Sequence, residues 1–439
     1  MMNQLIRGIL LLVAGLVLSL EVRADTPLRA GAAKIRITPS EPVSLAGFYV
    51  RQGPFKGIHD ELYARAVVFE SGGVVAAVVS VDICVLTDTF CDDVMVRIAE
   101  KYPIPRDHIL LNASHTHGGP ALYEPPGSGV LNAFWLDENP YADNQKKYTE
   151  ALKEKIVQVV GEARQKLIPA HIGFGKGSSS IGINRRTLTA KGDIVIGVNP
   201  GEPIDPEVCI VRVDDLEGKT LALMFNHGTH GVSMRSEQLT GDWCGIASQY
   251  IEETWGEGVI APFLSGAAGD VNSIYVAKKD FNDPSGNANV LAEILGKEVI
   301  RAARGITPEF TGPVKASQRV VTVPGKRYLG LLGIDPAYKE RAKDTSPAPD
   351  ARLRMSALRV GEVLFAASSG EVFSEIGREF KERSPYPRSL FMGITNGYSS
   401  YILTDREIDR GGYEYNASVV KSGGQAAILN TLLDLVAEF

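Results

Sequence analysis

The chain has 439 residues, of which 44% are hydrophobic and 22% are charged, an ordinary composition for a globular protein with a large core. Its formal net charge is −6, and no run of basic residues provides the concentrated positive face that nucleic-acid binding requires. We therefore expect no nucleic-acid partner.

The N-terminus has the pattern of a secretory signal peptide. Arg7 precedes an apolar run over residues 9–20, which is shorter than the roughly 20 residues of a membrane-spanning helix. Small residues at Val22 and Ala24, before Asp25, resemble a cleavage site. This favours a signal peptide over residues 1–24, with an uncleaved anchor as the alternative. We expect an exported protein, periplasmic or secreted, with a single domain over residues 25–439.

The cysteines show no spacing typical of metal ligands, although export would permit disulfides. We favour buried free thiols, with a Cys84–Cys91 bridge as the alternative. The four cysteines are Cys84, Cys91, Cys209 and Cys244.

Short apolar runs alternate with amphipathic stretches along the chain. Runs at 64–69 and 74–81, joined by a glycine turn at 71–73, predict neighbouring strands, and 109–112 predicts another. Apolar residues at helical spacing predict a helix over 148–167. Further strands are expected at 220–225, 260–264 and 363–366, and further helices at 247–255, 289–304 and 371–383. This order predicts an α/β fold with mixed β-sheets flanked by helices.

Two long irregular stretches, 118–144 and 326–349, are rich in glycine, proline or aromatic residues. Long loops inside a compact domain are usually functional or disordered. Their aromatic content favours a lid or pocket wall.

Four of the seven histidines fall in two short motifs. His115 and His117 follow the apolar run at 109–112, and His227 and His230 follow the run at 220–225. Neutral imidazole binds Zn²⁺ well, and two strand ends that each deliver histidine into a loop can build one metal site. A histidine that binds no metal can hydrogen-bond a ligand or a reacting oxygen. The alternative is that these are ordinary core or turn histidines, which we favour for His59, His108 and His171.

Two further segments supply acidic residues. The turn at 266–273 contains Asp270 among small residues, which would allow close approach to a ligand or serve packing alone. Glu371 lies between an expected strand and an expected helix, where the helix N-terminus already favours an anion. An additional structural metal near Asp82 or Asp242 is a further hypothesis.

The motifs, taken in order over residues 29–439, resemble the catalytic domain of the neutral, non-lysosomal ceramidases. They include Ser114-His115-Thr116-His117-Gly118-Gly119-Pro120, Ile183-Asn184-Arg185-Arg186, His230-Gly231-Val232-Ser233-Met234, Gly266-Ala267-Ala268-Gly269-Asp270, Gly370-Glu371 and Asn396-Gly397-Tyr398-Ser399-Ser400-Tyr401. The resemblance implies the ceramidase-like fold and a Zn²⁺ ion. It implies four metal ligands, which are His115, His230, Glu371 and Tyr401.

The resemblance also implies catalytic roles for His117, Arg185 and Tyr413. The family's catalytic serine position is here Asn272, followed by Ser273. Because an amide can hydrogen-bond but cannot act as that nucleophile, Asn272 favours attack by water. The C-terminal β-rich domain of ceramidases is expected to be absent.

These observations predict a zinc-dependent hydrolase that cleaves the amide bond of a small-molecule or lipid N-acyl substrate, ceramide-like or other. A lipid substrate would bring the protein into peripheral contact with a membrane. The alternatives are a zinc hydrolase of esters or sugar-derived N-acyl compounds, and a non-catalytic binding protein on the same scaffold.

Overall fold

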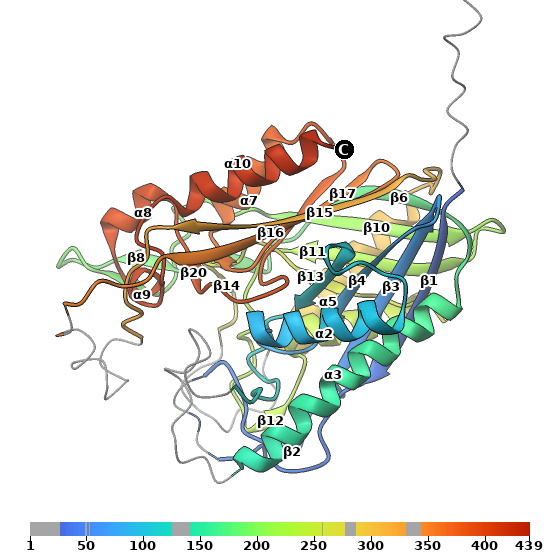
Figure 1. The fold of residues 1–439 in the computed structure, drawn as a ribbon. Helices are drawn as coiled ribbons and strands as arrows, with labels where there is room; N and C mark the ends of the chain where they lie inside the picture. Colours follow the sequence, from blue (N-terminus) through green and yellow to red (C-terminus); the bar gives the residue numbers. More distant parts are fainter. Residues whose placement is uncertain are drawn as a thin grey trace, which may run out of the picture.

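Two β-sheets lie at the centre of the protein, as seen in a computed structural model (Figure 1). The structure describes residues 27–48, 51, 53–124, 141–256, 258–276, 287–330, 343 and 345–439. The predicted signal peptide and parts of both predicted lid loops, 125–140 and 331–342, lie outside these residues. No helix among the described residues is long and apolar enough to cross a membrane.

Within the described residues, the larger sheet has eight strands in the order β13-β11-β10-β6-β1-β3-β4-β5. They are β1 (Arg29–Arg36), β3 (Tyr63–Ser71), β4 (Val74–Val81), β5 (Ile109–Ala113), β6 (Ile168–Ser178), β10 (Glu207–Asp215), β11 (Thr220–His227) and β13 (Phe263–Ser265). The β4–β5 and β11–β13 pairs are parallel and the other pairs antiparallel. The predicted mixed sheet and the hairpin of β3 and β4 are confirmed.

The second sheet has the order β15-β16-β17-β19. Its strands are β15 (Val314–Val323), β16 (Ala351–Val360), β17 (Val363–Ser368) and β19 (Ser389–Met392). The β17–β19 pair is parallel. Each sheet therefore contains parallel neighbours whose carboxyl ends point the same way.

The sheets pack face to face, and helices cover their outer faces. One hydrophobic cluster joins the sheets through Val67 and Phe69 of β3 and Phe365 of β17. The alternate residues Ala66 and Val68 pack beneath helices instead. Because both faces of β3 are covered, its residues 66–69 form a continuous apolar run. Full burial of one valine or phenylalanine contributes about 1.5–3 kcal/mol.

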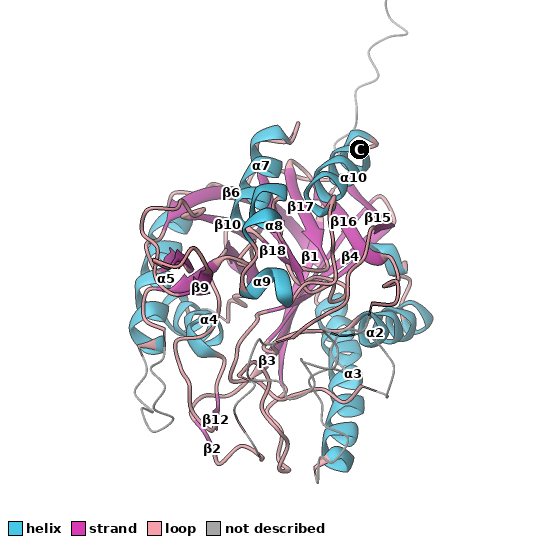
Figure 2. Ribbon diagram, turned by 90° about the vertical axis from the view of Figure 1, so that its left-hand side faces the viewer, coloured by secondary structure: helices cyan, strands magenta, loops and turns pink. Residues whose placement is uncertain are grey.

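The helices form two outer layers (Figures 1 and 2). Helices α2 (Asp88–Lys101) and α3 (Ala142–Gln165) cover one half of the larger sheet, and α4 (Asp242–Trp255) and α5 (Ala288–Arg304) cover the other. Helices α7 (Ser374–Arg383) and α10 (Gly424–Ala437) cover the second sheet. The predicted α/β architecture with flanking helices is confirmed.

Smaller elements connect these layers. The two-stranded pairs are β2 (Gly57–Ile58) with β12 (Gln238–Leu239), β7 (Gly182–Asn184) with β14 (Val271–Ser273), β8 (Arg186–Leu188) with β9 (Ile194–Ile196), and β18 (Glu371–Val372) with β20 (Tyr401–Ile402). The short helices are η1 (Arg106–His108), α8 (Asp405–Arg410) and α9 (Tyr413–Asn416).

Among the boundaries that differ from the predictions, two have a clear structural cause. The strand expected at 260–264 begins only at Phe263, because Pro262 has no N–H to donate to a ladder. The helix expected from residue 371 begins at Ser374, and Glu371 instead pairs with Tyr401 in a parallel ladder. The explanation of Glu371 as a residue at a helix N-terminus is therefore wrong. The four cysteines are buried and free, as favoured.

Candidate metal and catalytic site

The site lies where the carboxyl ends of strands from both sheets meet. His115 follows β5 by two residues, and His230 follows β11 by three. A bridge between Thr116 and Gly231 brings the two histidine loops together, and the His117 N–H donates to the Gly231 carbonyl at 3.0 Å. Direct pairing of Glu371 with Tyr401 in β18 and β20 adds the acidic side of the site.

Three side-chain atoms converge at the centre of the site. Glu371 Oε2 lies 3.0 Å from His230 Nε2 and 3.4 Å from His115 Nε2. The Tyr401 hydroxyl lies 3.5 Å from His230 Nε2. His115, His230 and Glu371 are 2%, 1% and 4% exposed, so water cannot screen them. The structure thus brings together all four predicted metal ligands.

The second ring nitrogen of each histidine fixes its tautomer. His115 Nδ1 lies 2.8 Å from the Cys84 carbonyl, and His230 Nδ1 lies 2.8 Å from the Ala268 carbonyl. A carbonyl only accepts, so each Nδ1 carries a proton, and the neutral form of each imidazole presents a lone pair at Nε2. A positive charge at this point, carried by a proton or by a metal ion, relieves the repulsion between the Nε2 lone pairs and the carboxylate oxygen. This donor set, with carbonyls orienting the imidazoles, suits Zn²⁺.

The protonation preferences show that Glu371 favours a positive charge beside it. Burial and the nearby Arg185 lower the pKa of His230 to about 4. Burial disfavours a charge on His115, yet Glu371 raises the pKa of His115 well above its ordinary value. Although burial opposes it, His115 holds the pKa of Glu371 well below its ordinary value. The ionised carboxylate therefore draws a cation to the centre.

The backbone bends sharply beside two of the predicted ligands. His115 has φ 62°, and Ser400, which precedes Tyr401, has φ 61°. Left-handed conformations are uncommon for residues with a side chain and cluster at functional sites. These two sharp turns of the backbone direct the side chains of His115 and Tyr401 towards the centre of the site.

The remaining predicted site residues surround this centre. His117 Nε2 lies 3.4 Å from His115 Nε2, and burial followed by the charge of His115 lowers the pKa of His117 well below its ordinary value. Arg185 Nη1 lies 3.1 Å from His230 Nε2 and donates to Asn272 Oδ1 at 3.2 Å. The Tyr413 ring contacts the Tyr401 ring at a centroid distance of 5.6 Å.

The small-residue turn at 266–270 serves close packing of backbone. A Cβ on Gly269 would lie 2.5 Å from the Glu371 carbonyl oxygen, and one on Gly266 would lie 2.9 Å from the Gly228 nitrogen. Asp270 accepts from the Ser374 N–H at 2.7 Å, at the start of α7. Burial raises its pKa to about 6. The turn therefore holds the strand of Glu371 against the histidine loops.

Two other histidines hydrogen-bond to backbone carbonyls outside the candidate metal site. His227 Nδ1 lies 3.1 Å from the Glu207 carbonyl, and His108 Nδ1 lies 3.0 Å from the Val75 carbonyl. The groups of His, Cys, Asp and Glu that could hold a metal in the described ranges are Cys84-His115-His117 and His115-His230-Glu371. Neither includes Asp82 or Asp242, so the hypothesis of an additional metal there finds no support.

Two partners of the site, the partly buried Tyr398 and the buried Glu414, were missed by the sequence interpretation. The Tyr398 hydroxyl donates to Glu371 Oε1 at 2.7 Å. The same tyrosine borders a cavity of about 550 Å³, a volume typical of small-molecule sites. Glu414 accepts from Arg185 Nε at 2.8 Å. Tyr398 lies inside a motif quoted above and Glu414 is adjacent to Tyr413, so proximity to predicted residues was the available signal.

Comparison with known proteins identifies the relatives of this architecture. A model of the neutral/alkaline non-lysosomal ceramidase N-terminal domain matches residues 29–287. A neutral ceramidase of Pseudomonas aeruginosa is 26% identical over 501 residues, which cover 96% of this chain and 73% of the relative. The crystal structure of neutral ceramidase from Pseudomonas aeruginosa matches with a TM-score of 0.76 at 21% identity, over 94% of this chain and 75% of that chain.

A second solved structure, described as ceramidase complexed with C2, matches with the same TM-score of 0.76 at 20% identity and with the same coverage. At these identities, the structural matches support the fold that the strand order and layers already define.

Proposed function

Because the chain belongs to the neutral/alkaline non-lysosomal ceramidase family, we propose that it is a zinc-dependent hydrolase that cleaves the amide bond of an N-acyl substrate. The observation that carries this proposal is the convergence of His115 Nε2, His230 Nε2 and Glu371 Oε2 on one buried point.

His115, His230, Glu371 and Tyr401 would hold the metal. When bound in a site of nitrogen and oxygen ligands, zinc supplies Lewis acidity towards a carbonyl and activates water at neutral pH. The two carbonyls that accept from the Nδ1 atoms orient both imidazoles with Nε2 towards the centre.

His117 is placed to move a proton. Its side chain lies at the partly exposed edge of the site, and its ring packs edge-on against His115 at a centroid distance of 4.8 Å. A neutral Nε2 there can accept a proton from the attacking water and return it to the leaving amine. The same imidazole would thus serve both halves of amide hydrolysis.

Arg185 and Tyr413 are placed to stabilise the oxyanion of the tetrahedral intermediate. The guanidinium carbon of Arg185 lies 5.3 Å from the Tyr401 ring centre and 5.7 Å from the Tyr413 ring centre. A permanently charged donor in a site shielded from water is effective because it need not reorganise during the reaction.

Asn272 supports attack by water rather than by a side chain. Its Oδ1 accepts from Arg185, and the neighbouring Ser273 hydroxyl donates to the Tyr275 carbonyl at 3.1 Å and accepts from Ser233 at 2.8 Å. Ser273 is fully buried. Its hydroxyl is therefore committed to packing contacts and is not available as a nucleophile.

The substrate class follows from the relatives, which are named as neutral ceramidases. We infer an N-acyl lipid or a similar linear amide, and export of the protein through the predicted signal peptide. The test incubates zinc-loaded protein with N-acyl sphingosines of several acyl lengths in H₂¹⁸O. We expect equal amounts of free amine and of fatty acid carrying one ¹⁸O. An inactive zinc-loaded protein across all linear amides, or cleavage of esters alone, would overturn the assignment.

A further inference from the structure

Glu414 is a fully buried carboxylate between two arginines of the catalytic segment. It is 1% exposed, and its Oε1 accepts from Arg185 Nε at 2.8 Å. Its other oxygen accepts from Arg186 Nη1 at 2.5 Å. The carboxylate therefore links α9, on which it lies, to the turn after β7 that carries Arg185, 229 residues earlier in the chain.

Two of the three guanidinium nitrogens of Arg185, Nε and Nη1, have partners in the site, and the third, Nη2, has none among the described residues. Nε donates to Glu414, and Nη1 donates to Asn272 and lies 3.1 Å from His230 Nε2. Nη2 is buried and has no hydrogen-bond partner among the residues that the structure describes. Since the guanidinium is planar, anchoring Nε and Nη1 fixes the direction of Nη2. A buried donor without a partner is costly, and a reacting oxygen would satisfy it.

Glu414 is also the counter-charge of Arg185. In the described part of the chain, it is the only carboxylate within ion-pair distance of that guanidinium. A buried charge that loses its partner is strongly destabilised, so without Glu414 the arginine would turn towards solvent or another acid. Helix α9 is itself held by Lys326, whose Nζ donates to the Tyr415 and Ser418 carbonyls at 2.6 and 3.0 Å.

We propose that Glu414 is a positioning residue that holds Arg185 with Nη2 directed at the developing oxyanion. This role rests on the proposed amide hydrolysis. Glu414 acts through Arg185 and does not itself contact the reacting atoms. Replacing the Glu414 carboxylate with an amide of the same shape should weaken stabilisation of the transition state and leave the metal ligands in place.

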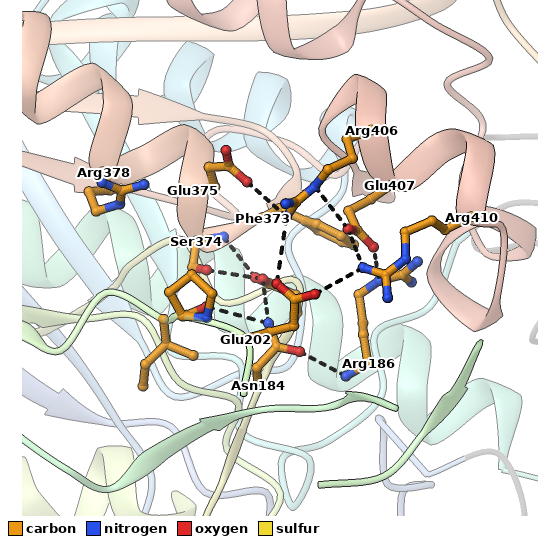
Figure 3. A pocket seen from close by; sticks show the side chains of 13 residues that line it. Asn184, Arg186, Glu202, Phe373, Ser374, Glu375, Arg378, Arg406, Glu407 and Arg410 are labelled. Atoms are coloured by element: carbon orange, nitrogen blue, oxygen red, sulfur yellow. Dashed lines mark hydrogen bonds and ion pairs between the residues drawn. The ribbon is translucent and has the colours of Figure 1, made fainter. Parts of the chain in front are cut away.

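Glu407 of α8 provides a matched control. It is 4% exposed and accepts from Arg186 Nε at 2.8 Å, and it also pairs with Arg410 (Figure 3). It makes no ion pair with Arg185 in the described structure. Glu407→Gln therefore removes a carboxylate from the same buried cluster without releasing the catalytic arginine.

The kinetic test compares Glu414→Gln and Glu407→Gln in the holoenzyme with an N-acyl sphingosine substrate. Because a misdirected oxyanion donor lowers the rate in the transition state, we expect kcat to fall about 10- to 100-fold in Glu414→Gln. KM and zinc content should change little, and Glu407→Gln should stay within about threefold of wild type. In an Arg185→Gln background, Glu414→Gln should cost almost nothing further, because the effect passes through Arg185. Equal losses in both single variants, or additive losses in the double variant, would overturn the proposal.

A second measurement does not depend on turnover. In protein labelled with ¹⁵N-arginine, the Nε–H signal lost in Arg185→Gln identifies Arg185. We expect slow solvent exchange of this proton in wild type and Glu407→Gln, and fast exchange in Glu414→Gln. Glu414→Asp, which keeps the charge but shortens the side chain, should give intermediate exchange if Glu414→Gln does not fold. Unchanged slow exchange in the Glu414 variants would refute the positioning role, whereas an inactive wild type with the expected exchange pattern would refute only the amide substrate.

Discussion

Removal of the Tyr398 hydroxyl should weaken zinc binding without unfolding the protein. In Tyr398→Phe, Glu371 Oε1 loses a donor at 2.7 Å while Oε2 keeps its position between the histidines. A hydrogen bond to a charged group contributes about 1.5–3 kcal/mol. Loss of such a contact behind a metal ligand typically lowers metal affinity about 10- to 100-fold, which agrees with that energy.

The assay is competition for zinc between the protein and a chelator of known affinity. Tyr148→Phe is the control, because Tyr148 donates to the Ile37 carbonyl at 3.0 Å, in a contact made outside the metal site. It should leave the zinc dissociation constant unchanged. The reasoning would be refuted if Tyr398→Phe bound zinc as tightly as wild type, or if Tyr148→Phe weakened zinc binding equally.

Further outcomes concern the ligands, the nucleophile and the N-terminus. His115→Ala should lose stoichiometric zinc while His227→Ala keeps it, as measured by elemental analysis of folded protein; retained zinc in the first variant would remove His115 from the ligand set. Ser273→Ala should keep kcat within about tenfold, because its hydroxyl contacts only packing partners; a loss of several orders of magnitude would restore a serine mechanism. Protein recovered from its exporting host should begin at Asp25 on N-terminal sequencing, and an intact N-terminus would favour an anchor.

The parts of the fold that depend on neighbouring residues could be predicted from the sequence. The β3–β4 hairpin followed from two apolar runs and the turn at 71–73. The helix α3 followed from its apolar periodicity, although it begins at Ala142, before the predicted residue 148. The histidine motifs lie at the carboxyl ends of β5 and β11, as their apolar runs indicated. Local periodicity and strand ends therefore located half of the site.

The remaining features of the site depend on contacts between residues that are far apart in the sequence. Glu371 looked like the start of a helix, but its backbone pairs with Tyr401, 30 residues later, and only that ladder turns its carboxylate to the histidines. The contact of Glu414 with Arg185 spans 229 positions. Neither contact leaves a periodic signal in the sequence, because each depends on how separate layers pack. The resemblance to ceramidases identified Glu371 and Arg185, but it carried no information on the groups that hold them.

The most direct test of zinc-dependent amide hydrolysis measures zinc content and turnover together, before and after chelation. The site predicts about one zinc per chain, amide cleavage that disappears when the metal is removed, and recovery when zinc is restored. Purified, folded protein without zinc, or amide cleavage that persists after complete metal removal, would contradict the account.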